Sequence, residues 1–555
     1  MLPWLLAANL LAAGPVIKLA DYGLAADGVT DDGPALGRAM AALREAEPGA
    51  SLVFPAGRTL RIASSPTTWV IELLGRRDLT VDGGGCTLLL APDLRLAHLR
   101  GCRNITLRGL NLDYEPLPFA DGLVVGADAA AGWIDVRVDD AFALPPLGGP
   151  TKEREQAYFA MLWHPGPHGL VHEHYFVADS REAEPGSLAR RIIRVYRQPG
   201  GDWRRIRPGV TRISLPVRGI AHRMVGFGAS PVLVVEENED VTCEQLGLWS
   251  GPLFGCNIAR NRGQVTFRHV DIRPRPGTGR LTSIWRDGFH VKANYAALTF
   301  EDCHIEGTND DAFNIATHSS RVVEAVAPTV IRLRQTFPLG YVPFEPGDLV
   351  GGFSMANGSR WRPVRVVRCD EEQPRNTASL DRPAPPLRLT LDAPLVDVSA
   401  GDVIWNESSA NPHTVIRRCT ILNACRFQSP VTVEDCDITA LAWFYGDQLE
   451  GPLPSDVTVR RCRLRIGRGN DQLAAKFECN IDGPDGKRAQ VRQPVIDRVR
   501  LEDNEIDGRL ELVDCREVTL ARNRFITPAG SLALRGCQGV TLDGNTRGGQ
   551  PYAGE

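Results

Sequence analysis

The sequence of 555 residues has no excess of charge of either sign and no long apolar run beyond its first residues. Its 63 Lys and Arg against 67 Asp and Glu leave a formal net charge of −4, and the basic residues are scattered. This balance argues against a nucleic-acid partner and against an anionic membrane surface. Without a later apolar segment of about 20 residues, we expect no membrane span.

Cysteine gives no disulfide framework, because there are 13 of them at irregular spacing. Residues 1–14 (MLPWLLAANLLAAG) have the apolar core and small residues of a signal peptide but lack its positive start. They predict a secreted or periplasmic protein; a wrongly assigned start or a truncated leader is the alternative. The length is too great for one compact core and suits an elongated solenoid with insertions.

A short pattern recurs along the chain: an aliphatic residue, Thr, an apolar residue, two polar residues, Cys or Asn, one residue, and an apolar residue. Several neighbouring copies are 19 to 26 residues apart. The clearest copies are LTFEDCHI at 298–305, VTVEDCDI at 431–438, VTVRRCRL at 457–464, VRLEDNEI at 499–506, VTLARNRF at 518–525 and VTLDGN at 540–545.

These repeats predict an all-β chain built as a right-handed parallel β-helix. A unit of about 20 residues with short alternating strands cannot bury its apolar face alone and must stack on its neighbours. The Cys and Asn positions would then stack coil on coil, so we interpret Cys303, Cys419, Cys436 and Cys462 as structural. A helical pattern from Pro34 to Ala46, after the segment DYGLAADGVTDD at 21–32, would cap the open end. This start resembles pectate-lyase-superfamily β-helices.

Two stretches lack the repeat and predict inserted small β-barrels or sandwiches. The expected organisation is a β-helix start with its cap at 15–119, an inserted barrel at 120–220, the β-helix with the catalytic coils at 221–319, a second inserted barrel at 320–406, the β-helix end at 407–546 and a loose tail at 547–555.

Acidic residues gather on two successive coils. Asp287 and His290 belong to WRDGFH, and Asp310, Asp311 and Asn314 belong to GTNDDAFN, with Asp287 and Asp310 23 residues apart. Equivalent positions on adjacent coils lie about 4.8 Å apart, so Asp287 should lie beside the pair. Crowding should raise at least one carboxyl pKa, which a general acid at neutral pH needs. An Asp-Asp pair alone is common in turns, but a second acid one coil away favours a site.

The segments RPRPGTGRLTS at 273–283, Asp287-x-x-His290 and NDDAFN at 309–314 resemble glycoside hydrolase family 110, bacterial exo-acting α-1,3-galactosidases. The resemblance implies a β-helix with inserted barrels, an oligosaccharide or polysaccharide substrate, and no metal or cofactor. It assigns Asp310 as general acid, with Asp287 and Asp311 activating water. Inversion then follows, with acid and base about 6.5–9.5 Å apart. The three-aspartate layout is also similar, more distantly, to family 28 polygalacturonases.

Around the acids, His290, Asn314, His318 and Arg280 are expected to bind substrate, although a histidine in a turn or an arginine paired with an acid is the alternative. Trp249, Trp285 and Trp443 could stack on sugar rings or fill the core. The chain departs from the family pattern at Asn309, where Gly is common, and at Ala316, where His is common. The departure at Ala316 makes the reaction type a firmer expectation than the sugar.

Two other functions stay open at this point. A polysaccharide lyase would use the acids as a base or to bind Ca²⁺. A non-catalytic β-helical adhesin or glycan-binding module would need no crowded acids. The sequence does not settle the linkage, exo against endo cleavage, or the oligomeric state, for which a homodimer is one alternative.

Overall fold

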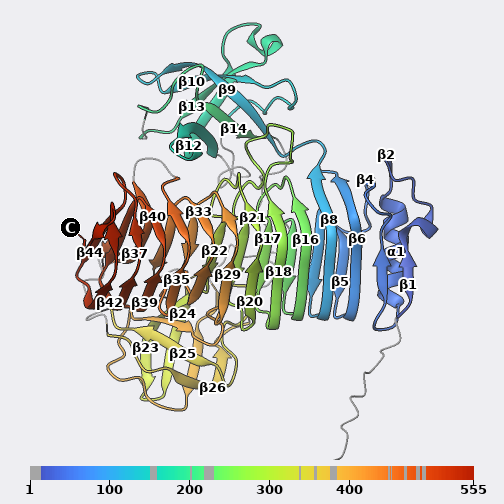
Figure 1. Cartoon of the computed structure of the whole chain (residues 1–555). Helices are drawn as coiled ribbons and strands as arrows, with labels where there is room; N and C mark the ends of the chain where they lie inside the picture. Colours follow the sequence, from blue (N-terminus) through green and yellow to red (C-terminus); the bar gives the residue numbers. More distant parts are fainter. Residues whose placement is uncertain are drawn as a thin grey trace, which may run out of the picture.

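The computed structural model is a parallel β-helix that carries two small closed barrels (Figure 1). It describes residues 14–149, 159–200, 203–217, 231–336, 339–355, 359–374, 384–447, 450–451, 453–467, 472–482, 488–490 and 495–554. The expected signal segment therefore lies outside the described residues except for Gly14. No helix among the described residues has the length and apolar character needed to cross a membrane.

One long sheet runs the length of the solenoid, and its strands pair in parallel from coil to coil, apart from the last pair. Its strands are β1 (Val16–Lys18), β2 (Asp27–Asp31), β3 (Ser51–Val53), β4 (Thr59–Ile62), β6 (Arg77–Leu90), β8 (Arg103–Tyr114), β16 (Glu239–Leu248), β18 (Arg262–Ile272), β20 (Ala297–Glu301), β21 (His304–Ile305), β29 (Thr414–Arg417), β30 (Thr420–Ile421), β32 (Val431–Glu434), β33 (Asp437–Thr439), β35 (Val457–Arg460), β36 (Arg463–Arg465), β39 (Ile496–Glu502), β40 (Glu505–Asp507), β42 (Cys515–Ala521), β43 (Arg524–Phe525), β45 (Gln538–Asp543), β46 (Thr546–Arg547) and β47 (Gln550–Pro551).

A second sheet, here called the site sheet, completes the coils. Its strands are β5 (Trp69–Leu74), β7 (Arg95–Arg100), β15 (Leu233–Glu236), β17 (Cys256–Ala259), β19 (Phe289–Lys292), β22 (Phe313–Ala316), β31 (Cys425–Phe427), β34 (Ala442–Gly446), β37 (Leu473–Asp482), β41 (Arg509–Val513) and β44 (Ser531–Arg535), and β38 (Arg488–Gln490) pairs antiparallel with β37. One continuous apolar core lies between the two sheets.

The helix α1 (Gly33–Glu45) packs on the first coils, preceded by a 3-10 turn η1 (Leu19–Tyr22). Its buried residues include Leu36, Met40 and Leu43, whose spacing places them on one face. This face covers the apolar end that the first coil would otherwise expose, as the sequence predicts (Figure 1).

Buried side-chain ladders join successive coils where the repeat carries Asn or Cys. Asn261 donates through Nδ2 to the Val235 carbonyl at 2.9 Å and to Asn294 Oδ1 at 2.9 Å. Asn523 makes the matching bonds to the Leu501 carbonyl at 2.9 Å and Asn545 Oδ1 at 3.0 Å. Each side-chain amide thus hydrogen-bonds both to a buried backbone carbonyl of one adjacent coil and to the Asn of the other.

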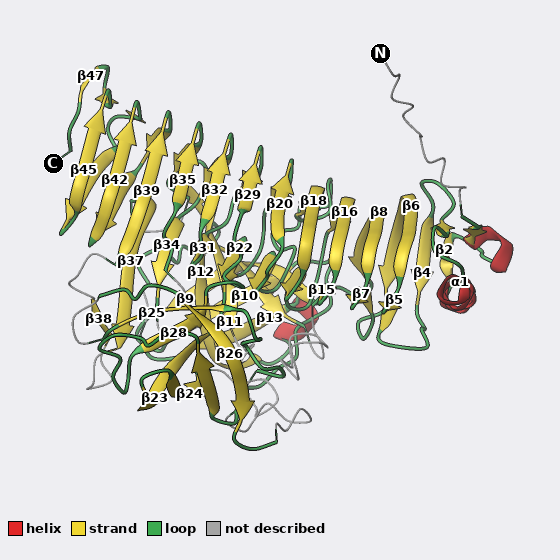
Figure 2. Ribbon diagram, turned by 90° about the horizontal axis from the view of Figure 1, so that it is seen from below, coloured by secondary structure: helices red, strands yellow, loops and turns green. Residues whose placement is uncertain are grey.

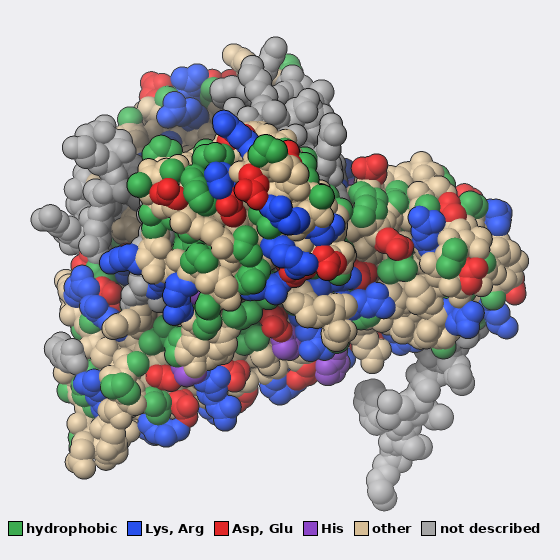
Figure 3. All heavy atoms as spheres, turned by 90° about the horizontal axis from the view of Figure 1, so that it is seen from above, with side chains coloured by type: hydrophobic (Ala, Val, Ile, Leu, Met, Phe, Trp, Pro, Cys, Tyr) green, Lys and Arg blue, Asp and Glu red, His purple; other side chains and the backbone are tan. Residues whose placement is uncertain are grey.

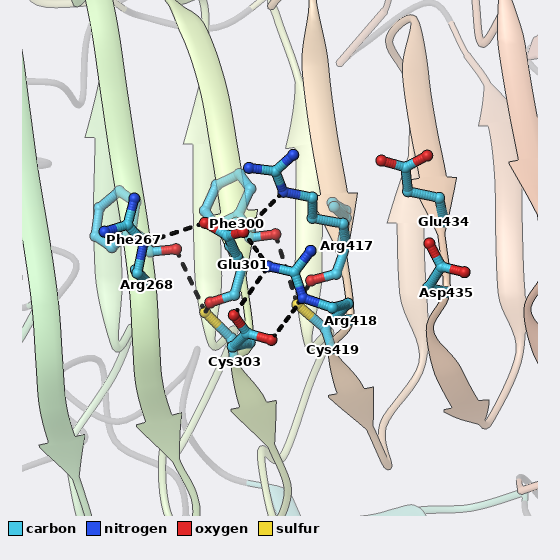
Figure 4. A network of polar contacts seen from close by, with 12 residues as sticks. Phe267, Arg268, Phe300, Glu301, Cys303, Arg417, Arg418, Cys419, Glu434 and Asp435 are labelled. Atoms are coloured by element: carbon cyan, nitrogen blue, oxygen red, sulfur yellow. Dashed lines mark hydrogen bonds and ion pairs between the residues drawn. The ribbon is translucent and has the colours of Figure 1, made fainter.

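The cysteine positions behave in the same way. Cys303 and Cys419 point inward from adjacent coils, and their Sγ atoms lie 3.6 Å from the carbonyls of Phe267 and Phe300 (Figure 4). All 13 cysteines are free thiols, and most are buried. Burial and stacking account for these residues without a disulfide or a reactive thiol.

On the outer face of the same coils, arginines and acids alternate. Glu301 accepts a hydrogen bond from Arg268 at 3.1 Å and forms an ion pair with Arg417 at 3.0 Å, and Arg418 pairs with both Glu301 and Asp302 (Figure 4). These pairs lower the pKa of Glu301 to about 2 despite the opposing effect of its burial. Figure 3 shows acidic and basic side chains interspersed on the face seen from above.

The first barrel closes around its own apolar core and leaves the solenoid after β8. It consists of β9 (Phe119–Asp128), β10 (Trp133–Val138), β11 (Phe159–Gly166), β12 (Gly169–Glu182), β13 (Ile192–Arg197) and β14 (Arg212–Pro216), with a 3-10 turn η2 (Ser187–Arg190).

The second barrel leaves the solenoid after β22 and also has its own core. It consists of β23 (Ser319–Ala327), β24 (Val330–Gln335), β25 (Leu349–Phe353), β26 (Val364–Glu371), β27 (Leu387–Leu391) and β28 (Val403–Asn406). The barrels stand at opposite edges of the solenoid in Figure 1, and Figure 2 shows both on the side where the site sheet lies.

The predicted fold class, an all-β parallel β-helix with a capping helix and two small inserted barrels, is confirmed. The tail is not loose as expected. β46 and β47 form a short antiparallel pair, and the Tyr552 ring packs against Phe525 at 5.1 Å while its hydroxyl accepts from Leu532 N. This contact gives the last coil an apolar cover.

Candidate active site

The three aspartates lie in the turns that precede β19 and β22. On β19, Phe289 and Val291 point into the core, so His290 and Lys292 lie on the outer face of the site sheet. The Phe289 and Phe313 rings stack at 4.9 Å beneath the two strands. This packing holds the register and places the residues before each strand side by side.

Asp287, Asp310 and Asp311 offer carboxylate oxygens that all lie within 4.8 Å of one another. Asp287 is only 2% exposed, and the Gly288 amide donates to the Asp311 carbonyl at 2.8 Å. The expected acid–base separation of about 6.5–9.5 Å is therefore wrong for the closest oxygens. The coils are one strand spacing apart and Asp311 directly follows Asp310, which brings the three carboxylates together.

Two arginines neutralise the Asp pair. Arg286 contacts Asp310 Oδ2 at 2.8 Å, and Arg426 on β31 contacts Asp311 Oδ2 at 3.0 Å. Arg426 also lies 3.7 Å from Glu450. With both guanidinium groups in place, two of the three carboxylates have a countercharge that is part of the chain.

The third carboxylate has neutral partners instead. Asp287 Oδ2 lies 2.7 Å from His290 Nδ1 and 3.3 Å from Asn314 Nδ2. Burial, and then the charge of Asp310, raise the pKa of Asp287 to about 7. Burial, the largest single effect, acts in the same direction on Asp310, but the charges of Arg286, His174 and Arg426 together outweigh it and hold the pKa of Asp310 below its usual value. In the free site the pKa of Asp287 is therefore higher than that of Asp310, and the shared proton resides on Asp287.

His290 is a neutral imidazole in this setting. Its burial, and then the charge of Lys292, hold its pKa well below the usual range. The Phe254 ring stacks on it at 4.2 Å. His290 Nε2 and Asp287 Oδ1 are buried and have no hydrogen-bond partner in the described part of the chain. Two such atoms beside a carboxylate cluster are suited to a bound polar ligand.

A buried cation lies behind the cluster. Lys292 Nζ donates to Asn314 Oδ1 at 2.8 Å and to Glu450 Oε2 at 2.9 Å. Burial would raise the pKa of Glu450, but Lys292 and Arg426 hold it well below its usual value. Ala316 pairs in register with Lys292, and His318 follows in a buried position where burial lowers its pKa to about 3.

The charges argue against a divalent ion among these acids. Asp310, Asp311 and Glu450 are balanced by Arg286, Arg426 and Lys292, and Asp287 takes a proton near neutrality. A Ca²⁺ ion at these acids would bring two further positive charges beside both guanidinium groups.

The structure does not bring every predicted residue to the acids. Arg280 contacts Asp113, which is 1% exposed, at 2.8 and 2.9 Å. Trp249 lies beneath Arg275 at 5.1 Å, and Arg275 contacts the same Asp113. Arg280 and Trp249 thus belong to an ion-pair cluster around Asp113, and no contact between them and the three aspartates is recorded in the described residues.

Trp285 cannot stack on a sugar, because it is 1% exposed. It stacks on Phe119 at 6.5 Å, in a cluster with Met161 and Trp163 of the first barrel. Trp443 is different. It follows Arg426 in register on the site sheet, is partly exposed, donates to Glu478 at 3.0 Å and lies 4.1 Å from the Tyr445 ring.

Several neighbours of the acids were missed in the sequence. Arg286 adjoins Asp287, and Arg426 follows Asn314 in strand register, so the repeat held a signal for both. Glu450 lies in a loop after β34, and His174 comes from the first barrel, where no repeat gives the register. His174 Nε2 donates to the Asn309 carbonyl at 2.9 Å.

No model of a known protein family matches the chain. Curated relatives do. The α-1,3-galactosidase B of Bacteroides thetaiotaomicron is 25% identical over 450 residues, which cover 76% of this chain and 69% of the relative. The α-1,3-galactosidase A of Bacteroides fragilis is 20% identical over 511 residues, 85% of this chain and 79% of the relative. The chain is a homologue of these enzymes. The resemblance predicted from the sequence is thereby confirmed.

Among solved structures, the surface adhesin PfbA of Streptococcus pneumoniae aligns with a TM-score of 0.39 and 10% identity, over 96% of this chain and 91% of that chain. A likeness this weak carries no functional information. The homologous α-1,3-galactosidases place the chain among glycoside hydrolases.

Proposed function

We propose that this glycoside hydrolase removes terminal α-1,3-linked galactose from a glycan or polysaccharide, with inversion at the anomeric carbon. The observation that carries the proposal is the carboxylate cluster of Asp287, Asp310 and Asp311, in which Asp287 takes a proton near neutrality while the pKa of Asp310 is held below its usual value. Hydrolysis of a glycosidic bond needs both an acid and a base, and this cluster supplies both.

Asp310 is the general acid in this proposal, and Asp287 and Asp311 activate the water. In the free site the proton resides on Asp287, and Asp310 pairs with Arg286. Because the two carboxyls interact strongly, they titrate as a pair that shares one proton. Donation from Asp310 to the leaving oxygen therefore requires this proton to move to Asp310 when substrate binds, which leaves Asp287 ionised beside Asp311.

The short distances suit a water held by two carboxylates. Two hydrogen bonds of about 2.7–2.8 Å to one water place their acceptors roughly 4.5 Å apart. The oxygens of the cluster, within 4.8 Å of one another, match this span. The cluster would hold the nucleophilic water on one side of the sugar. A retaining enzyme with a covalent intermediate is the alternative that the same short spacing favours.

Leaving-group dependence tests the acid. Asp310→Asn should lower kcat/KM by about 10²- to 10⁴-fold on α-1,3-galactosyl oligosaccharides, whose leaving group needs a proton. The loss should be much smaller on a dinitrophenyl α-galactoside, whose leaving group departs unprotonated. Asp311→Asn should impair both substrates equally. If Asp287→Asn, and not Asp310→Asn, showed the leaving-group dependence, the acid would be Asp287.

Product analysis tests the remaining parts. Proton NMR of the first product should show β-galactose; α-galactose released first would establish retention. Free galactose should be the sole early product from an end-labelled oligosaccharide; internal fragments would refute exo action. If wild type cleaves no α-galactoside, the proposed sugar is wrong. A product absorbing in the ultraviolet, lost on chelation of calcium, would instead establish a lyase.

Export and a secreted or periplasmic location stay predictions from the first 14 residues. Fractionation of the native host, followed by sequencing of the mature N-terminus, tests both.

A further inference from the structure

We propose that the first barrel is a positioning element of the active site, acting through a buried hydrogen-bond chain that ends on the residue before Asp310. The chain consists of Asp121, Ser214, Thr282 and Asn309, each at most 1% exposed. The expected change in kcat rests on the proposed function, whereas the expected change in hydrogen exchange of the turn does not.

The chain begins on two barrel strands. Ser214 on β14 donates from its hydroxyl to Asp121 Oδ1 on β9 at 2.5 Å, and Trp163 Nε1 donates to the same Ser214 hydroxyl at 2.9 Å. The other Asp121 oxygen accepts the backbone amide of Leu281 at 2.9 Å. The barrel thereby holds the start of the segment that leads to Asp287.

Thr282 carries the chain from the barrel into the solenoid. Its Oγ1 lies 2.9 Å from Ser214 Oγ and 3.2 Å from Asn309 Oδ1. A hydroxyl carries a single hydrogen, so Thr282 donates to one of these two oxygens at a time. In either case the Thr282 hydroxyl lies between the first barrel and the residue that precedes Asp310.

Asn309 is held from the barrel a second time. Its carbonyl accepts from His174 Nε2 of β12 at 2.9 Å, and its own amide donates to the Ile284 carbonyl at 3.0 Å. Asp310 follows at once, with Arg286 on its carboxylate. The Asn309 side chain contacts Thr282, so it links the turn to the first barrel in a way that a glycine at this position could not.

The apolar contact beside the chain supports the same role. Trp285 stacks on Phe119, and both pack with Met161 and Trp163. Burial raises the pKa of Asp121 to about 6, which marks it as a carboxyl that the interface encloses. The barrel therefore contacts both catalytic turns, the one before Asp287 and the one before Asp310.

The test is Thr282→Val, which keeps the side-chain shape and removes the hydroxyl. A displacement of the catalytic turn should lower kcat on α-1,3-galactosyl oligosaccharides by about 10- to 100-fold and leave KM nearly unchanged. Thr282→Ser should restore most of kcat. Ser214→Ala, which breaks the chain from the barrel side, should reproduce the loss.

Hydrogen exchange measured by mass spectrometry provides a readout that needs no activity. Peptides covering 305–312 should exchange faster in Thr282→Val, while those covering 499–506 stay as in the wild type. Thr211→Val is the control, since Thr211 is equally buried in the first barrel but its hydroxyl contacts the Arg205 carbonyl. It should leave kcat and the exchange of 305–312 unchanged.

Wild-type kcat and exchange in Thr282→Val would overturn the proposal. Equal losses in Thr282→Val and Thr282→Ser would also overturn it, because the hydroxyl would then not be the cause. If wild type hydrolyses no α-galactoside, the proposed function fails, and the exchange result alone decides whether the barrel positions the turn.

Discussion

Replacing Asp287 by Asn should stabilise the folded protein as the pH rises, while it abolishes hydrolysis. Asp287 is 2% exposed, and its pKa is raised to about 7. A carboxyl with a higher pKa in the folded than in the unfolded state weakens the folded state as it ionises. The loss begins near the unfolded value of about 3.9, grows until the folded value is passed, and is constant above it.

The size follows from the shift. One pH unit corresponds to about 1.4 kcal/mol, so ionisation between about pH 5 and the folded pKa costs the wild type roughly 3 kcal/mol. The Asn side chain does not titrate and can accept from His290 as the carboxylate does. The advantage of Asp287→Asn in free energy of unfolding should therefore be roughly 3 kcal/mol greater at about pH 8 than at about pH 5.

Calorimetry at the two pH values measures this difference. For cooperative unfolding of a chain of this length, roughly 3 kcal/mol corresponds to a change of about 2–3 °C in Tm. Asp310→Asn is the control of opposite sign, because it leaves the partly buried Arg286 without its carboxylate and should lower Tm at both pH values. An advantage of Asp287→Asn that did not grow with pH would refute the assignment of the raised pKa to Asp287.

Three further outcomes are expected. Trp443→Ala should raise KM for oligosaccharides by about tenfold with kcat unchanged, because its ring is a partly exposed aromatic beside Arg426; an unchanged KM in initial-rate kinetics would exclude it as a sugar-stacking residue. Asn261→Leu should lower the free energy of unfolding by about 3 kcal/mol, since it leaves buried polar groups of Asn238 and Asn294 without a hydrogen-bond partner. Denaturant unfolding measures this, and wild-type stability would contradict a stabilising role for the asparagine ladder. Chelation with EDTA should change neither activity nor Tm, and activity restored by added Ca²⁺ would show that the charge balance of the site is incomplete.

The coils were predictable because the repeat records which residues face inward. In VTVEDCDI the apolar residues are buried and the acidic residues are at least partly exposed, so the pattern gives both the strand and its face. The juxtaposition of Asp287 with Asp310 followed from the length of one coil. Their split pKa values did not, because these depend on Arg286 and on burial beneath neighbouring segments.

What the sequence could not predict lies where segments without the repeat meet the solenoid. Trp285 is an aromatic residue next to the acids, which suggested stacking on a sugar ring, yet Phe119 of the first barrel packs on it and it is buried. Glu450 reaches Lys292 from 158 residues along the chain, and no periodicity links the two. The expected separation of about 6.5–9.5 Å between acid and base was also wrong for the closest oxygens. It applies to enzymes whose two carboxylates lie on opposite sides of the sugar, whereas here the acids lie on adjacent coils.

The coils before and after each inserted barrel pair directly with each other, which bears on the order in which parts of the chain fold. Thr106 on β8 pairs with Thr242 on β16, and Phe300 on β20 with Ile416 on β29, as though nothing lay between. Closing a disordered loop of more than 100 residues costs roughly 4 kcal/mol of chain entropy. A barrel that has already collapsed on its own core brings its ends together and removes most of that cost. The barrels should therefore form before the coils that follow them, and a defect in either barrel core should slow solenoid growth beyond its insertion point.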